Sequence, residues 1–304
     1  MSIDFENFET TMTGELDKAI VHKPVTGFFA DNNLRAKFVG GKTVLIPEMS
    51  FSGLGDYDRD TGFVSGTVSV TAEPYTLKMD RGRSFQLDRE DNDETGIADL
   101  AGQVMGEFVR TQVVPEIDAY VLSKLASFAA GKAQTVEGTP ETDAYGMLME
   151  AIGKVQNAVG YDEELVAFVD SNMWSALQQS GDISRMLVAS DFAKGELNTQ
   201  VKSINGVSIL PTPDSRMKTA FTFNDGVSEN QVVGGFAPAD TAQNIGLLVL
   251  PRRAASLVKK TEKVRTFDPA HNLNADAWKF DYRVYYDLFI RNSMENAIVA
   301  YIAS

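Results

Sequence analysis

The chain has 304 residues, and 43% of them are hydrophobic, so it can bury a substantial core and is not a disordered protein. Its formal charge of -14, from 28 basic and 42 acidic residues, argues against tight binding of nucleic acid phosphates. It has no cysteine, which excludes disulfides, thiolate zinc sites, iron–sulfur clusters and thiol nucleophiles. At about 100 to 200 residues per domain, this length predicts about two domains.

We expect no membrane partner and no secretion signal. The N-terminal segment is acidic and lacks an apolar core run, and a weak helical pattern covers Gly14–Val21. The longest apolar stretches, such as Ile245–Leu250, fall far short of the roughly 20 residues that span a bilayer. The sequence therefore predicts a soluble, non-secreted chain of mixed helix and strand.

Residues 43–90 read as a β-rich region with thin apolar content. A short β run, Thr43–Ile46, is expected to stop at Pro47, and the Gly- and Asp-rich stretch 50–66 favours an exposed turn. Alternating apolar residues then predict strands over Val64–Thr71 and Tyr75–Met79. Because an isolated ribbon is marginal in water, we expect the region to lie on another chain or to pack as a hairpin on its own domain.

Apolar residues at helical spacing predict a long helix from Thr95 to Ala130. Thr95 can cap its start, and Gly131 can end it. Pro115 separates two apolar sets and lacks a backbone donor, so we expect a bend or break there. About 35 residues at roughly 1.5 Å each would reach on the order of 50 Å, which is long for a globular domain.

A second helix and a compact α/β region follow. Thr139 and the proline after it form a cap and first turn, and the helical pattern ends at Gly160. Leu165–Val169 is an apolar strand, and Asp170 or Ser171 can cap the helix behind it. These elements predict a small domain of strands covered by helices.

Further strands complete the chain. Asn205-Gly206 is a strong hairpin turn, and Gln231–Phe236 and Ile245–Leu250 are predicted strands, whereas Arg253–Glu262 favours a helix. Large apolar residues alternate with polar ones from Trp278 to Leu288. A polar turn and the run 297–302 then predict a long terminal hairpin.

Histidines and nucleophile motifs give no support for catalysis. His22 and His271 are isolated, so a surface or capping role is the better interpretation of each. The sequence contains no G-x-S-x-G elbow and no Walker motif, and its Gly53-Leu54-Gly55 run precedes no helix. We therefore predict no catalytic residue, no cofactor site and no enzyme.

Two acidic stretches fail the calcium-loop test. Asp56, Asp58 and Asp60 have the alternate spacing, but threonines stand where the glycine and the closing glutamate belong. A second stretch starting at Asp91 has a glycine at its closing position. We predict solvated turns and no metal site, with an adventitious surface cation as the weaker alternative.

Basic residues form two modest clusters interleaved with acids, which favours ion pairing within or between chains over contact with nucleic acid. The clusters are Arg81, Arg83 and Arg89, then Arg252, Arg253, Lys259, Lys260 and Lys263. The acidic turn would suit a basic surface on a neighbouring subunit. The candidate inter-subunit contacts are Asp56, Asp58, Arg59, Asp60, Arg81, Arg83, Arg252, Arg253 and Lys259.

Several phrases of the sequence resemble the major capsid proteins of tailed phages. Two of them resemble the junction between the extended loop and the spine helix, one resembles the spine helix, and two resemble the terminal strands. The junction phrases are 80–88 and 91–95, the spine-helix phrase is 108–120, and the terminal-strand phrases are 278–283 and 287–289. Their order along the chain agrees as well, over most of the chain from about residue 40 onward.

This resemblance implies an α+β Hong Kong 97-type capsid fold. The implied parts are an N-terminal arm (1–42), an extended β loop (43–90), a spine helix with the peripheral domain (91–139), an axial domain (140–250) and returning peripheral strands (251–304). The implied function is a virion capsid protein that assembles in the host cytoplasm, as pentamers and hexamers of itself, into an icosahedral shell around double-stranded DNA. The short N-terminal arm has no room for a fused scaffolding domain, so a separate scaffolding protein and a portal are implied partners.

Two other functions stay open from the sequence. An encapsulin nanocompartment uses the same fold to hold a cargo enzyme. An α/β small-molecule enzyme in the 140–250 region is the weaker alternative, because a fold pattern alone does not establish activity. DNA is expected to be contacted weakly and without specificity.

Overall fold

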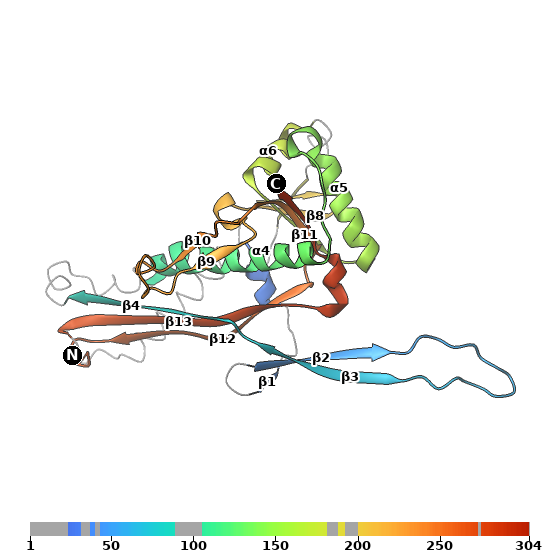
Figure 1. Cartoon of the computed structure of the whole chain (residues 1–304), viewed down its shortest axis with the longest axis horizontal. Coiled ribbons are helices and arrows are strands. Elements are labelled where there is room, and N and C mark those ends of the chain that lie inside the picture. Colours follow the sequence, from blue (N-terminus) through green and yellow to red (C-terminus); the bar gives the residue numbers. More distant parts are fainter. Residues whose placement is uncertain are drawn as a thin grey trace.

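The computed structural model describes residues 24–31, 37–39, 43–88, 105–180, 188–191, 200–272 and 275–303. Several predicted features lie outside these ranges: the weak helix at 14–21, the start of the long helix at Thr95, and the residues His22, Arg89 and Asp91. Figure 1 shows a triangular body of stacked layers with a β ribbon projecting from one corner. No helix in the described ranges is long and apolar enough to cross a membrane.

The base of the body is a long three-stranded antiparallel sheet. Its order is β12 (Ala255–Phe267), β13 (Ala277–Ile290) and β4 (Met79–Asp88). The predicted alternation along β13 is confirmed, since Phe280, Tyr282 and Val284 face the core under the long helix. The prediction of a helix over 253–262 is wrong, because pairing along the whole of β13 outweighs local preference and makes this segment a strand.

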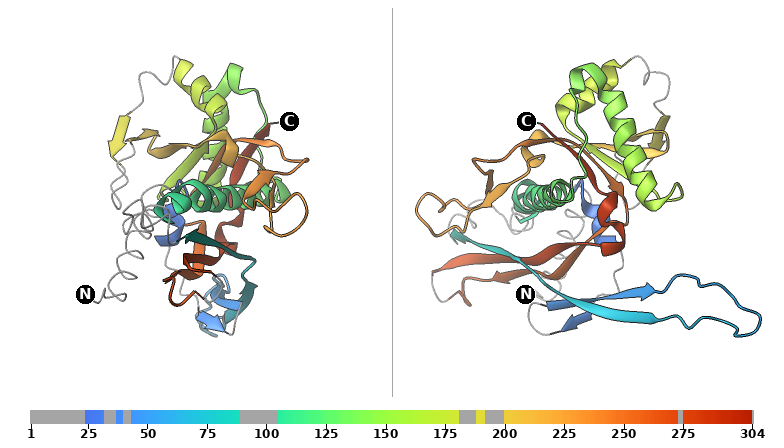
Figure 2. Two further views of the ribbon diagram at one scale, coloured as in Figure 1. Left: turned by 90° about the vertical axis from the view of Figure 1, so that its left-hand side faces the viewer. Right: turned by 45° about the vertical axis from the view of Figure 1, so that its right-hand side comes forward.

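A long helix lies over this sheet (Figures 1 and 2). Its described part starts at Met105, passes through a π-helical turn at Val109–Val113 and continues as α4 (Val114–Gly131). Pro115 therefore lies inside a continuous helix, so the expectation of a break there is wrong, and the irregularity is the π turn immediately before it. The amide of Val114 bonds the carbonyl of Val109, and this inserted residue lets a proline follow within a helix.

The upper layer is a six-stranded sheet in the order β14-β11-β5-β8-β7-β6, in which only the pairing of β5 with β8 is parallel. The strands are β14 (Val299–Ala303), β11 (Asn244–Pro251), β5 (Leu165–Val169), β8 (Val207–Pro211), β7 (Gln200–Ile204) and β6 (Val188–Asp191). Helices α5 (Pro140–Val159) and α6 (Ser171–Gln179) cover one face, and α4 lies against the other. Both faces of β5 are therefore buried, which explains its continuous apolar run.

Local signals predicted several of these elements correctly. Strand β5 has the predicted bounds, Asp170 caps α6 by accepting from the amide of Met173 at 2.7 Å, and Gly160 ends α5 with a positive φ of 87°. Asn205 and Gly206 have positive φ angles of 50° and 79°, as the predicted two-residue hairpin between β7 and β8 requires.

The predicted terminal hairpin is wrong. A 3-10 turn, η4 (Asn292–Ala297), carries the chain out of the long sheet, and β14 then pairs with β11 in the upper sheet. The predicted strand at 231–236 is also mostly wrong. Positive φ angles at Gly234 and Gly235 make this a turn between the short strands β9 (Phe221–Phe223) and β10 (Phe236–Pro238).

The projecting ribbon, here called the β arm, comprises β2 (Thr43–Phe51), β3 (Val68–Thr76) and the loop 52–67 between them. A short strand, β1 (Lys37–Val39), pairs only with residues 43–45 of β2. Strand β2 continues through Pro47, contrary to the predicted stop, because this proline lies beyond the β1 pairing, where β2 is an edge. Strand β3 begins at Val68, later than predicted.

Candidate subunit interface

One face of the β arm is apolar and uncovered. Met49 stands opposite Val70, and Phe51 stands opposite Val68, so these four side chains share one face of the ribbon. Their exposed fractions are 63%, 63%, 69% and 66% in that order. Ser50 and its cross-strand partner Ser69 lie on the other face. Uncovered apolar faces of this kind mark surfaces that bind another molecule.

The loop at the end of the arm has a defined turn but buries little. Ser52 closes it by bonding Thr67 through both backbone and side chain, at 3.0 and 2.8 Å. Asp58 and Gly62 pair as an isolated bridge, and the rings of Tyr57 and Phe63 are tilted by 58° with their centroids 4.9 Å apart. Large side chains nevertheless stay exposed along it, namely Leu54, Tyr57, Phe63 and Val64.

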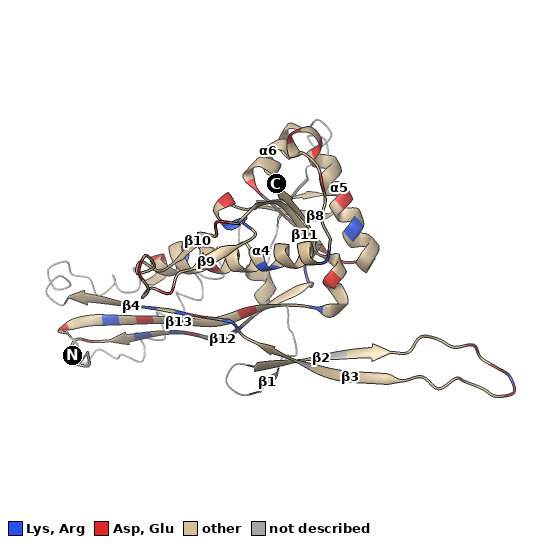
Figure 3. Cartoon of the chain, in the orientation of Figure 1, with Lys and Arg blue, Asp and Glu red and all other residues tan. Residues whose placement is uncertain are grey.

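The acidic residues of this loop divide into two roles. The carboxylate of Asp58 accepts from the amides of Asp60 and Thr61, at 2.7 and 3.4 Å, and so holds the turn. Asp56, Arg59 and Asp60 are exposed at the tip of the arm. Figure 3 shows both charge signs at the tip and few charges along the strands of the arm.

The base of the arm is anchored to the long sheet by a small core of its own. Val44 and Leu77 pack with Tyr285 and Phe289 of β13. The hydroxyl of Tyr285 donates to the carbonyl of Leu77 at 3.2 Å, and the ring of Tyr75 meets Phe289 edge-on at 5.2 Å. These contacts fix the direction in which the arm leaves the body.

Asp287 adds a buried polar anchor at the same place. Its carboxylate accepts from the amide of Lys78 at 3.1 Å, from the hydroxyl of Tyr120 at 2.7 Å and from Lys124 at 2.5 Å. Only 1% of the residue is exposed, so these charge-assisted bonds form away from water. Asp287 therefore ties the base of the arm to helix α4.

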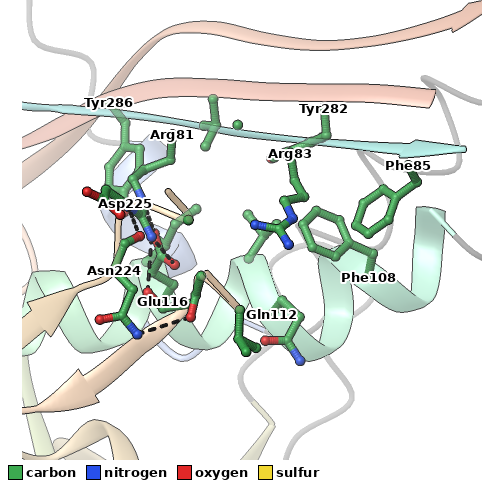
Figure 4. A pocket seen from close by; sticks show the side chains of 18 residues that line it. Arg81, Arg83, Phe85, Phe108, Gln112, Glu116, Asn224, Asp225, Tyr282 and Tyr286 are labelled. Atoms are coloured by element: carbon green, nitrogen blue, oxygen red, sulfur yellow. Dashed lines mark hydrogen bonds and ion pairs between the residues drawn. The ribbon is translucent and has the colours of Figure 1, made fainter. Parts of the chain in front are cut away.

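Arg81, one of the candidate contact residues, is committed inside the chain (Figure 4). Its guanidinium makes a two-pronged ion pair with Glu116 of the long helix, at 2.7 and 3.2 Å. It also donates to the carbonyls of Asn224 and Gly235, at 2.7 and 3.1 Å. The arginine therefore joins β4, α4 and the β9–β10 loop, and this planar geometry suits arginine better than lysine.

Arg83 lies beside Arg81 at the rim of a cavity of about 290 Å³, shown in Figure 4. Its two terminal nitrogens make long contacts of 3.4 Å to the carbonyl of Val232. Side chains at Gly226 or Gly234 would meet its guanidinium at 2.8 or 3.2 Å, so these glycines make room for it. Arg83 is exposed and remains open to a partner.

The chemistry of this cavity is not that of an activated site. The phenols of Tyr282 and Tyr286 line its wall, and burial raises the pKa of each well above its ordinary value. Both are therefore neutral and weakly nucleophilic near pH 7. Glu116 is held by Arg81, and no group of three or more His, Asp or Glu side chains gathers for a metal ion in the described ranges.

The other basic candidates are also paired within the chain. Arg252 forms an ion pair with Glu164 at 3.0 Å, and Arg253 forms one with Glu163 at 2.6 Å. Lys259 lies 3.0 Å from Glu262. The sequence-based interpretation of the basic clusters as ion pairs thus holds for these three residues and for Arg81. Within one subunit, the acidic tip of the β arm projects away from the body that carries these basic residues.

Asp118 is a buried structural residue that the sequence analysis missed. Its buried carboxylate accepts from the amides of Val25 and Thr26, both at 3.1 Å, from the Thr26 hydroxyl at 2.5 Å and from Arg216 at 2.8 Å. Burial raises the pKa of Asp118, and the Thr26 bonds and the Arg216 charge oppose that shift. Asp118 joins η1 (Gly27–Asp31), α4 and η3 (Asp214–Arg216).

The fold of this chain is similar to those of solved capsid and virus-like particle structures. No family model and no curated protein matches the chain. The capsid structure of the cyanophage P-SCSP1u is 13% identical and aligns with a TM-score of 0.61 over 88% of this chain and 85% of that one. The structure from Gordonia phage Cozz is 15% identical, with a TM-score of 0.59 over 88% and 83%. A virus-like particle from Pyrococcus furiosus is 11% identical, with a TM-score of 0.51 over 98% and 100%.

The chain has the tailed-phage capsid fold. The expected α+β, Hong Kong 97-type architecture is thereby confirmed. Within this architecture the β arm projects from the body, and the helix from Met105 to Gly131 lies over the long sheet. The two buried carboxylates, Asp118 and Asp287, hold the capsid fold together where its layers meet.

Proposed function

We propose that this chain is a major capsid protein that assembles as pentamers and hexamers into an icosahedral shell around double-stranded DNA. The observation that carries the proposal is the apolar β arm on a capsid fold. A capsid fold provides the wall of a shell, and an arm that its own subunit leaves uncovered needs a neighbour. The role is structural and not catalytic, and its place is the virion.

The energetics of the arm support a partner. Ordering each backbone residue costs about 1–2 kcal/mol, whereas burying one large apolar side chain returns roughly 1.5–3 kcal/mol. The large side chains of the arm loop return little here, because Leu54, Phe63 and Val64 are exposed by 107%, 89% and 70%. A neighbouring subunit that covered them would supply the missing stabilisation.

The predicted division into parts becomes a proposal with one amendment. We propose an N-terminal arm (1–42), an extended β loop (43–90), a spine helix with the peripheral domain (91–139), an axial domain (140–250) and returning peripheral strands (251–304). The amendment concerns β14, which belongs with the axial part because it pairs with β11. A separate scaffolding protein and a portal are the proposed helpers, and assembly takes place in the host cytoplasm.

An encapsulin-type compartment is the second candidate. The similarity to the Pyrococcus furiosus virus-like particle covers 98% of this chain and all of that one, and it supports a shell subunit of either kind. The two candidates differ in contents, since one encloses a genome and the other a cargo enzyme.

Electron microscopy of the purified chain tests the shell proposal. We expect closed particles of uniform diameter built from rings of five and six subunits. Particles from infected or expressing cells are then assayed for nuclease-protected DNA and for co-purifying protein. Protected genome-length DNA supports the phage shell, whereas a packaged enzyme without DNA supports the compartment. A monodisperse small oligomer at all concentrations would refute both.

The free subunit should bind DNA weakly and hold no metal. We expect a Kd for duplex DNA weaker than about 10⁻⁶ M at physiological salt, without sequence preference, because a chain of charge -14 repels phosphates. Elemental analysis after dialysis should find zinc and calcium far below one ion per chain. Tight, sequence-selective binding, or a full equivalent of either metal, would contradict the structural role.

A further inference from the structure

The outer face of the long sheet, which points away from α4, is covered near the arm and open farther away. Tyr285 and Phe289 of β13 belong to this face and are buried under the base of the arm. Two residues before Tyr285, Arg283 has a side chain that is 63% exposed. The open half runs from there to the end where β12 and β13 join.

Charged residues gather on this open half. Register and strand alternation place on it Lys263, Arg265, Lys279, Arg283, Asp80 and Asp281. Lys263 stands directly opposite Arg283, an arrangement of like charges that destabilises an antiparallel pair. On the other side of Arg283 stands Gly82, which has no side chain to shield it. The face is therefore positive, although the chain as a whole is acidic.

Partners within the chain neutralise only some of these cations. Arg283 pairs with Asp80 at 2.6 Å, and Lys279 lies 3.7 Å from Asp281. Among the residues that the structure describes, no carboxylate forms an ion pair with Lys263 or with the next residue on that face, Arg265.

These two cations line a hollow of about 310 Å³, here called the basic hollow, whose walls are Thr261, Lys263, Arg265, Asp281 and Arg283. Lys263 and Arg265 are exposed on it. The hollow holds three cations, Lys263, Arg265 and Arg283, and one carboxylate, Asp281, which stands opposite Arg265. This excess of positive charge selects an acidic partner, because a charged group gains most where its counter-charge is held in place.

The tip of the β arm has the complementary charge. Asp56 and Asp60 are exposed, and Asp58 fixes the turn that presents them. These three carboxylates outnumber the single cation, Arg59. Because the turn is already formed in the free subunit, less entropy is lost when the tip binds.

The tip and the basic hollow cannot meet within one subunit. In Figures 1, 2 and 3 the β arm and the joined ends of β12 and β13 lie at opposite ends of the molecule. A contact between them therefore joins two copies head to tail. Such a contact uses two different surfaces, and it closes into a ring when the rotation between copies is a simple fraction of a turn.

We propose that the acidic tip of the β arm binds the basic hollow of a neighbouring copy and sets the rotation between subunits in each ring. The proposal rests on the proposed shell function and names the surface that receives the arm. The apolar face of the arm supplies most of the affinity. The charges steer the encounter and set the register, since exposed ion pairs contribute little singly.

Charge reversal with compensation tests the pairing. Lys263→Glu/Arg265→Glu and Asp56→Lys/Asp60→Lys should each slow assembly, followed by light scattering at low salt, by about tenfold or more, because steering of opposite charges is lost. In a mixture of the two variants, every contact is complementary only where the variants alternate, which a ring of six permits and a ring of five does not. One chain with all four changes should assemble at close to the native rate. Failure of the four-fold variant to recover would overturn the proposal.

Two further variants distinguish failure of this proposal from failure of the shell function: a charge-matched control, and a chain in which a short linker replaces the arm loop. Lys154→Glu/Lys218→Glu makes the same change in charge on the upper layer and should leave the rate within about twofold of native. If the reversals assemble normally while deletion of the arm loop abolishes particles, the shell function stands and the basic hollow is not the receptor. If the native chain forms no particles, the shell function itself fails.

Discussion

Replacing Ser52–Thr61 with a short Gly-Ser linker is expected to give folded subunits that no longer form closed particles. The deleted stretch makes few contacts with its own subunit, whereas the small core at the base of the arm remains. Circular dichroism and thermal unfolding should therefore stay near native. Negative-stain images should show free subunits or open fragments instead of shells. Normal shells from this variant would remove the basis for treating the arm as an assembly element.

Two neighbouring point variants give a sharper form of the same test. Phe51→Asp places a charge on the apolar face of the arm, and Ser50→Asp places the same charge one residue away on the opposite face. Burying an unpaired carboxylate at an interface costs several kcal/mol, so only the first variant should lose assembly. Equal behaviour of the two would show that this face stays in water in the shell.

Local sequence signals predicted local structure well and failed where a distant partner decides. The cap at Asp170, the turn at Asn205-Gly206 and the buried strand Leu165–Val169 depend on neighbouring residues, and all three are present. Segment 253–262 became a strand because β13 pairs along it. The run 297–302 was assigned to the nearest strand in sequence, but it pairs with β11 about fifty residues earlier.

The two buried carboxylates could not be singled out for the same reason. Asp287 alternates with apolar residues in a strand and reads as a solvent-facing position, yet the base of the arm covers it. Asp118 follows Ile117 directly in the apolar half of the helix, and a charged residue within a buried stripe was the only available signal. Its partners, Thr26 and Arg216, lie more than ninety positions away in the sequence.

The basic candidates show the limit of charge patterns. Arg252 and Arg253 were named as candidate contacts for the acidic turn of a neighbour, and within the chain Glu163 and Glu164 from another segment pair with them. Lys263 belonged to the same cluster and carries no such pair in the described part of the chain. Which cation stays available is decided by tertiary pairing, and composition does not contain that information.

Substitution of Asp118 is expected to have the largest effect on stability in the described part of the chain. The residue is fully buried, and Asp118→Ala would leave Arg216, the Thr26 hydroxyl and two amides without their acceptor. Breaking a buried ion pair by removing one partner costs about 3–5 kcal/mol. We expect the midpoint of thermal unfolding to fall by about 10 °C. Asp240→Ala removes an exposed aspartate and serves as the control, with an expected change of less than about 0.5 kcal/mol.

A double-mutant cycle then shows whether the effect comes from the ion pair. Arg216→Ala leaves the Asp118 carboxylate buried with hydrogen bonds but no counter-charge, so it should also destabilise the fold. The double variant should cost less than the sum of the two single variants by about 1–3 kcal/mol, because neither charge is left alone. Additive costs would mean that the carboxylate depends on Val25 and Thr26 and not on Arg216. A loss below about 1 kcal/mol for Asp118→Ala would instead show that η1, α4 and η3 are held together without it. The expected coupling matters for assembly, because Asp118 joins the segment that enters from the N-terminus to the helix on which both sheets rest.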